Sequence, residues 1–229
     1  MINTYNESSL HKTLKDFFAY RYDGKTEVQI DGYICDIVTK DNLIIEIQTA
    51  HLSSLNTKIE NLVLSHKVLL VYPLCTTTFI QTVDKNGKII SRRKSPKKQT
   101  IYSIFGELYR LYNLFDDENF SLLVLTTEQL KIKQLTNEKV QSKQKSRRFK
   151  KNYIITDKQL LQIHDEILFN SREDFLKLLP KNLPEVFSSK NLQTTEVKNE
   201  ANKMLWVLAK MNLIKIDHKE GKLIFYKKL

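Results

Sequence analysis

Two short apolar runs separated by a polar cluster form the clearest pattern in the chain. Residues 33–38 and 43–47 are rich in β-branched side chains, and the polar residues 39–42 between them suit a turn. The pattern predicts a β-hairpin. Alternation along its second strand places three aliphatic side chains on one face, and Glu46 and Gln48 on the opposite face.

Hydrophobic periodicity predicts the elements that surround this hairpin in the first 135 residues. In chain order they are a helix at 8–20, a strand at 27–30, the hairpin, a helix at 51–64, a strand at 67–72 that ends at Pro73, a hairpin at 79–83 and 88–91, a helix at 101–115 and a strand at 120–126. We expect residues 1–135 to form one mixed α/β domain.

Apolar residues nearly vanish between residues 136 and 153, and this stretch is interpreted as a basic linker, with a basic hairpin arm as the alternative. The rest of the chain, 154–229, is predicted to be a small helical domain that ends in a hairpin. Its expected elements are helices at 157–169, 171–179, 189–193 and 196–212, then strands at 214–217 and 222–226 around a turn.

Asp36 interrupts the apolar first strand of the central hairpin, and Glu46 lies on the second strand. A carboxylate in such a strand is costly unless it is paired, hydrogen-bonded or bound to a metal. Mg²⁺ is usually held by one or two protein carboxylates together with phosphate oxygens of the substrate. Asp36 and Glu46 are therefore candidate ligands of Mg²⁺, for which Mn²⁺ can substitute. The alternative is that both face solvent or pair with lysines.

The spacing of these residues resembles the PD-(D/E)XK nuclease superfamily. Asp36 is followed by nine residues and then by Glu46-x-Gln48 at the end of an apolar strand. The resemblance implies an α/β restriction-endonuclease-like core with the order αβββαβ and a mixed sheet. It also implies that Asp36, Glu46 and the backbone carbonyl of Ile47 bind the metal. Gln48 stands where the superfamily usually has lysine, and from there it can orient the attacking water.

Two further catalytic candidates follow from the same resemblance. A lysine can migrate to the helix after the hairpin, and Lys58 is placed to supply the charge that Gln48 lacks. An acid on the first helix can join the metal ligands, and Glu7, one turn before His11, is the candidate. The alternatives are a solvated lysine and an acid that is favoured by the helix macrodipole.

The net charge of +11 is concentrated in two stretches. One comprises Arg92, Arg93, Lys94, Lys97 and Lys98. The other, residues 139–151, carries seven positive charges, Arg147 and Arg148 among them, and no acid. Focused basic patches point to a polyanion, and we expect double-stranded DNA as the partner. A solvated linker is the alternative for the second stretch.

The C-terminal pattern of short helix, turn, long helix and hairpin resembles a winged helix-turn-helix. On this interpretation residues 196–212 form the recognition helix. Polar side chains able to reach phosphates and base edges lie on its outer face, and two lysines lie on the wing. These candidates are Lys198, Asn199, Asn202, Lys203, Lys219 and Lys222. Winged helices also bind proteins, so a protein partner stays open.

No apolar run approaches the length of a membrane span, and the N-terminal residues show no signal pattern, so we expect a cytoplasmic protein. The two cysteines, Cys35 and Cys75, lie in apolar strand-like surroundings and have no neighbours at the spacing of zinc ligands. Buried reduced thiols are therefore expected. Oligomeric state, including a homodimer, is left open.

Together these patterns predict a Mg²⁺-dependent endonuclease that hydrolyses phosphodiester bonds in duplex DNA, in restriction or in repair. The main alternative is a DNA-binding regulator built on a catalytically inactive nuclease scaffold, which the glutamine at position 48 motivates. RNA as the substrate is a third possibility.

Overall fold

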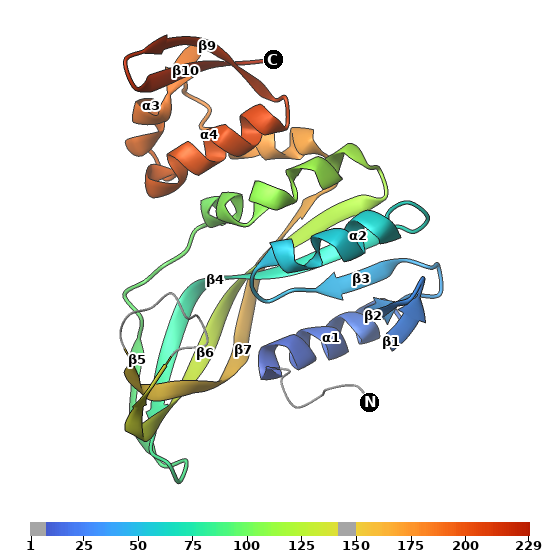
Figure 1. The fold of residues 1–229 in the computed structure, drawn as a ribbon, viewed down its shortest axis with the longest axis vertical. Helices are drawn as coiled ribbons and strands as arrows, with labels where there is room; N and C mark the ends of the chain where they lie inside the picture. The colour runs from blue at the N-terminus through green and yellow to red at the C-terminus, as the bar shows by residue number, and fades with distance from the viewer. Residues whose placement is uncertain (1–7, 142–149) are drawn as a thin grey trace.

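The computed structural model describes residues 8–141 and 150–229 of the chain. In this part of the chain seven strands form a large mixed sheet in the order β1-β2-β3-β4-β6-β7, with β5 paired to β4. Three more strands form a small antiparallel sheet in the order β8-β10-β9. Figure 1 shows helices packed along the large sheet and a separate group of short helices around the small one. The fold is therefore mixed α/β, as expected.

The first elements follow the predicted order closely. They are α1 (Ser9–Arg21), β1 (Lys25–Ile30), β2 (Tyr33–Val38) and β3 (Ile44–Ile47). Ser8 caps α1, and β2 and β3 pair antiparallel with Ile37 opposite Ile45. The predicted alternation in β3 is confirmed, because Ile45 packs against α1 on one side of the sheet whereas Ile44 packs into the core on the other side.

A helical crossover follows β3, and two parallel strands complete the middle of the sheet. The elements are η2 (Leu52–Leu55), α2 (Asn56–Leu62), β4 (Val68–Val83) and β6 (Phe120–Val140). The prediction that the fourth strand ends at Pro73 is wrong, since β4 continues for ten residues beyond it. The pairing with β3 stops at Val71, so the missing N–H of Pro73 falls where β4 has no partner on that side.

The large sheet extends much further than the sequence predicted. Strand β5 (Ile89–Lys94) returns along β4, and β7 (Lys151–Phe169) pairs antiparallel with β6. Figure 1 shows β4, β6 and β7 running side by side well past the shorter strands. The predicted helix at 157–169 is therefore wrong, and the expected domain boundary at 153 falls inside β7. The alternative of a basic hairpin arm agrees with the pairing of β6 and β7 on either side of residues 142–149, which lie outside the described chain.

The predicted helix at 101–115 consists instead of three short 3₁₀ segments. They are η3 (Ile101–Gly106), η4 (Leu108–Arg110) and η5 (Tyr112–Asp116). A 3₁₀ helix has three residues per turn, so side chains three apart lie above one another. Phe105, Leu108, Leu111 and Leu114 have this spacing, and all four are buried. This spacing suits the 3₁₀ conformation.

The C-terminal elements surround the small sheet. They are η6 (Arg172–Leu178), β8 (Val186–Ser188), α3 (Ser189–Gln193), η7 (Lys198–Glu200), α4 (Ala201–Lys210), β9 (Ile214–Glu220) and β10 (Leu223–Lys228). The short helix and the hairpin agree with the sequence prediction. The long helix expected at 196–212 is shorter, because Lys198 takes a left-handed backbone conformation at φ 39° and only Ala201–Lys210 is α-helical.

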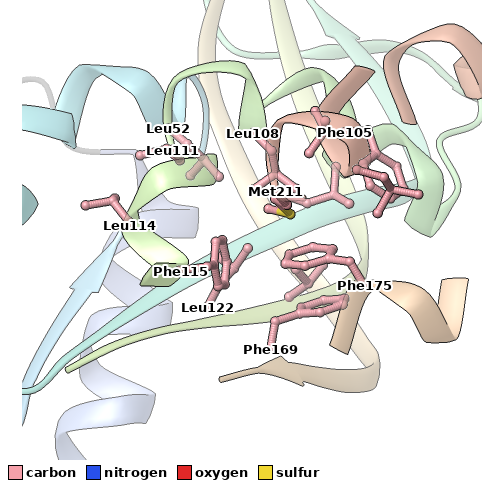
Figure 2. Close-up of a cluster of buried hydrophobic side chains, with 14 of the residues drawn as sticks. Leu52, Phe105, Leu108, Leu111, Leu114, Phe115, Leu122, Phe169, Phe175 and Met211 are labelled. Atoms are coloured by element: carbon pink, nitrogen blue, oxygen red, sulfur yellow. The ribbon is translucent and has the colours of Figure 1, made fainter. Parts of the chain in front are cut away.

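A single hydrophobic cluster joins the two sheets. Figure 2 shows side chains from the 3₁₀ segments, from β6 and β7, and from the C-terminal helices packed against one another. Phe175 of η6 stacks on Phe169 of β7, with ring centroids 4.3 Å apart. Trp206 of α4 stacks in turn on Tyr109 of η4. The small sheet therefore packs onto the same core as the large one.

Within the described ranges, no helix is long and apolar enough to cross a membrane.

Candidate functional site

Asp36 and Glu46 meet where β2 and β3 lie side by side. The backbone N–H of Asp36 donates to Glu46 Oε1 at 3.2 Å, and the backbone N–H of Ile47 donates to Asp36 Oδ2 at 2.9 Å. The Glu46 side chain is only 3% exposed and that of Asp36 is 22% exposed. Two carboxylates thus converge at one point of the sheet, and each is oriented by the backbone of the neighbouring strand.

Lys58 reaches the same point from α2. Its ammonium lies 2.6 Å from Glu46 Oε2 and donates to the carbonyl oxygen of Ile34 at 2.7 Å. The side chain is 16% exposed, so it is not a freely solvated surface lysine. The structure therefore places Lys58 beside the candidate carboxylates, and its catalytic role stays a prediction.

His11 is a site residue that the sequence analysis missed. It lies in the first turn of α1, where its backbone N–H is held by the capping Ser8. Its Nε2 lies 2.9 Å from the carbonyl oxygen of Ile47 and 3.3 Å from Asp36 Oδ2. A carbonyl only accepts hydrogen bonds, so Nε2 carries the hydrogen. The sole signal in the sequence was the spacing of His11 one turn after Glu7, which lies outside the described residues.

The two carboxylates have opposite pKa shifts. Burial alone would raise the pKa of Asp36, but the hydrogen bonds from His11 and from Ile47 N–H outweigh it and lower that pKa. Burial, and then the charge of Asp36, raise the pKa of Glu46 despite its pair with Lys58. Burial next to Glu46 also raises the pKa of the Cys35 thiol to about 11. Opposite shifts in adjacent carboxylates are typical of functional sites.

Gln48 does not join this cluster through its side-chain amide nitrogen. That nitrogen donates to Ser54 Oγ at 2.6 Å and to the carbonyl oxygen of His51 at 3.3 Å. Gln48 therefore ties the end of β3 to the start of the helical crossover. This placement differs from the water-orienting role expected of it, which remains a prediction.

The donor set suits a hard divalent cation. Among the residues the structure describes, no three His, Cys, Asp or Glu side chains are grouped so as to hold a metal ion. Mg²⁺, however, needs only one or two carboxylates beside water and phosphate oxygens. Asp36, Glu46 and the carbonyl oxygen of Ile47 supply three oxygens within one short stretch of paired strands. The residues present therefore fit Mg²⁺.

The first basic stretch expected at DNA lies on and just after β5. Arg92, Arg93 and Lys94 are exposed on β5, which extends beyond the strand predicted at 88–91, and two of these cations lie over the ring of Phe79. Lys97 and Lys98 follow directly as exposed residues. Arg147 and Arg148 lie outside the described residues.

The C-terminal candidates are mostly exposed on the small sheet and its helices. Lys198, Asn199 and Asn202 face solvent at η7 and the start of α4, whereas Lys203 is partly buried and pairs with Glu200 at 2.7 Å. Lys219 on β9 and Lys222 in the following turn are exposed as well. Lys203 is therefore the least available of the set.

Comparison with known proteins places this site in a family. A family model described as a domain of unknown function, DUF8091, matches residues 8–170. The chain belongs to the DUF8091 family. The matched range begins at the cap of α1 and ends just after β7, so the DUF8091 domain comprises the whole large sheet with Asp36, Glu46, Lys58 and His11. The C-terminal sheet lies outside it.

A relative shares both parts of the chain. An uncharacterized protein of Treponema pallidum (strain Nichols) is 32% identical over 227 residues, which covers 99% of this chain and 87% of the relative. Its similarity thus extends beyond the DUF8091 domain through the C-terminal sheet. No solved structure matches the chain.

Proposed function

We propose that this DUF8091 protein is a Mg²⁺-dependent DNA endonuclease with a PD-(D/E)XK-type site. The observation that carries the proposal is the meeting of Asp36, Glu46 and Lys58 within hydrogen-bonding distance at paired strands of a mixed sheet. Two carboxylates on neighbouring strands, with a lysine from α2 beside them, match what phosphodiester hydrolysis needs. A structural ion pair alone would not need the second carboxylate.

The proposed chemistry divides between the cation and the side chains. Asp36, Glu46 and the Ile47 carbonyl would hold Mg²⁺, which supplies polarisation of the phosphate, a lowered pKa for water and charge for the leaving oxygen. Lys58 provides a fixed positive charge beside that phosphate, which the neutral side chain of Gln48 cannot supply. Preorganised charges of this kind stabilise the transition state without reorganising during the reaction.

His11 has a positioning role in this proposal. Its Nε2 bonds to the Ile47 carbonyl and lies close to Asp36, so it holds two of the three candidate oxygens in place while keeping Asp36 ionised.

Two surfaces are proposed to hold the DNA. The exposed cations of β5 lie on the extended part of the large sheet, and their charges suit the phosphate backbone. The C-terminal elements, with α3, α4 and the β9–β10 hairpin, are proposed to act as a winged helix that contacts duplex DNA through Asn199 and Asn202. Restriction and repair roles are both compatible with this arrangement.

Cleavage of defined substrates tests the proposal. The purified protein is incubated with supercoiled plasmid, linear duplex, single-stranded DNA and RNA, each in Mg²⁺, in Mn²⁺ and in EDTA. We expect duplex DNA to be cut in Mg²⁺ or Mn²⁺ and to remain intact in EDTA. Tight DNA binding without cleavage in either metal would favour the alternative of a regulator on an inactive scaffold. Preferential cutting of RNA would correct the substrate.

A further inference from the structure

A polar pocket of about 370 Å³ opens beyond the end of β3. Its walls come from distant parts of the chain: the residues after β3, the middle of β4, the segment after β5, and the facing strands β6 and β7. Lys97, Lys131 and Lys158 line it together with one carboxylate, Glu107. The lining therefore carries a net positive charge, and it lies outside the cluster of Asp36, Glu46 and Lys58.

Two of these lysines face each other across the sheet. Lys131 of β6 and Lys158 of β7 are directly opposite in the strand register, and both are partly buried. Neither side chain forms an ion pair or a hydrogen bond with any described residue of the chain. Like charges directly opposite on paired strands are destabilising. Burial lowers the pKa of Lys158, and the charge of Lys131 lowers it further. An anion between the two ammonium groups would relieve this repulsion.

Two other residues of the pocket wall, Gln129 and Glu107, form hydrogen bonds within the protein. The side-chain amide of Gln129 donates to Thr127 Oγ1 at 2.9 Å and to the carbonyl oxygen of Pro73 at 3.3 Å. Glu107 is engaged as well, because it accepts the backbone N–H of Leu52 at 3.1 Å. One oxygen of the single carboxylate is therefore occupied by the backbone, and Glu107 forms no ion pair with Lys131 or Lys158.

The residues that line the pocket adjoin, along the chain, both the strand that carries Glu46 and the basic strand β5. Thr49, Ala50 and His51 line it, and they follow directly after β3, which carries Glu46. On the other side, Ser95 comes immediately after the basic strand β5, and its N–H donates to the Thr78 carbonyl oxygen at 2.8 Å. A nucleic-acid strand that lies along β5 and reaches Glu46 would pass this pocket.

We infer that the pocket is a phosphate-binding subsite, in which Lys131 and Lys158 together hold a phosphate of the nucleic-acid strand next to the scissile position. The inference rests on the proposed function. The ligand chemistry is a phosphate group, and its source is either the bound strand or free phosphate. Lys97, which also lines the pocket, contributes a third charge.

Titration with pyrophosphate tests the site without any need for cleavage. The variant Lys131→Gln/Lys158→Gln is compared with Lys133→Gln, a control on the same strand whose ammonium lies over the Tyr153 ring instead. We expect pyrophosphate to raise the Tm of the wild type and of the control, and to leave the double variant unchanged. Without ligand, the double variant should be at least as stable as the wild type, because the repulsion is gone. Equal pyrophosphate binding by all three proteins would overturn the inference.

Duplex binding identifies the source of the phosphate. In the Glu46→Ala background, which is not expected to cut, the two lysine changes should weaken duplex binding by about tenfold or more, as for the loss of charge-assisted hydrogen bonds. If pyrophosphate binding is lost but duplex affinity is unchanged, the pocket takes free phosphate, and its assignment to the strand is refuted. If the protein binds pyrophosphate but cuts no substrate, the proposed nuclease function is refuted and the phosphate-binding pocket is still supported.

Discussion

Lys58 Nζ lies 2.6 Å from Glu46 Oε2, although the two residues belong to a helix and to a strand separated by a turn of 3₁₀ helix. This pair brings a positive charge to the carboxylates from α2. Position 48, two residues after Glu46, holds a glutamine whose amide nitrogen is engaged with His51 and Ser54. In the proposed nuclease the helix therefore supplies the cation that the strand lacks.

Replacing Lys58 should slow cleavage far more than replacing Gln48. Loss of one preorganised electrostatic contact costs about 10²–10³ in rate, and we expect this loss for Lys58→Ala in single-turnover measurements. Gln48→Ala should have a smaller effect, since its side-chain nitrogen bonds to the crossover rather than to the carboxylates. The exposed Lys67→Ala serves as the matched control. Wild-type rates in Lys58→Ala would reduce Lys58 to a structural partner of Glu46.

Replacing His11 should raise the pKa of Asp36. In the folded protein the hydrogen bonds from His11 and Ile47 lower this pKa, so Asp36 stabilises the fold above its unfolded pKa and loses that contribution as the pH falls through the folded value. His11→Ala removes one of these donors. The free energy of unfolding of the His11→Ala variant should then depend less on pH in the acidic range than that of the wild type.

Carboxyl NMR of Asp36 measures this shift directly. Lys12→Ala, an exposed lysine next to His11 on α1, is the control and should leave the Asp36 pKa where it is. An unchanged Asp36 pKa in His11→Ala would mean that the backbone N–H of Ile47 alone sets it.

Glu46→Gln should abolish cleavage yet leave the metal-free protein at least as stable as the wild type. Burial and the charge of Asp36 both disfavour the ionised form of Glu46, and the neutral amide avoids both costs. In a chain of this size, each gain of about 1 kcal/mol in the free energy of unfolding raises Tm by about 2–4 °C. Thermal unfolding in EDTA provides the measurement. A large drop in Tm would show that the pair with Lys58 dominates, and that the cluster is built for stability.

Local patterns were sufficient to predict the part of the fold that carries the carboxylates. The β-branched runs of β2 and β3 and the capped start of α1 were recognisable because each obeys a single period over its whole length. Asp36 and Glu46 stood out because charged residues are rare in such strands. Their convergence with Lys58 was expected only from the family resemblance.

Contacts between residues far apart in the sequence explain why strand β7 and the role of His11 were not predicted. In β7, Leu160, Ile163 and Ile167 have the spacing of a helix face, whereas the pairing with β6 is interrupted by register shifts that break the two-residue alternation of a strand. Such shifts depend on the partner strand, so they are invisible in the local pattern. His11 was missed for a similar reason, since its partners Asp36 and Ile47 come from other elements.

Neutralising the cations of β5 should weaken DNA binding in a salt-dependent manner. If Arg92, Arg93 and Lys94 each meet a phosphate, replacing all three with glutamine should flatten the slope of log affinity against log salt by about two to three. Cleavage should fall too, because β5 runs into the segment next to the pocket beyond β3. Replacing Lys25, Lys40 and Lys67, three exposed lysines outside the proposed DNA surfaces, serves as a control of equal charge. An unchanged slope in the β5 variant would show that these three cations do not contact the DNA phosphates.

The most direct test of the nuclease site is the single-turnover cleavage rate of Asp36→Ala and Glu46→Ala in saturating Mg²⁺ or Mn²⁺. Asp41→Ala, which removes an exposed carboxylate from the turn of the same hairpin, is the control. We predict that Asp36→Ala and Glu46→Ala each lose cleavage by at least about 10³-fold, the scale of several kcal/mol that a catalytic metal supplies. Both should still fold and bind duplex DNA, and Asp41→Ala should cut like the wild type. Full cleavage by Glu46→Ala would contradict the assignment of this cluster as the active site.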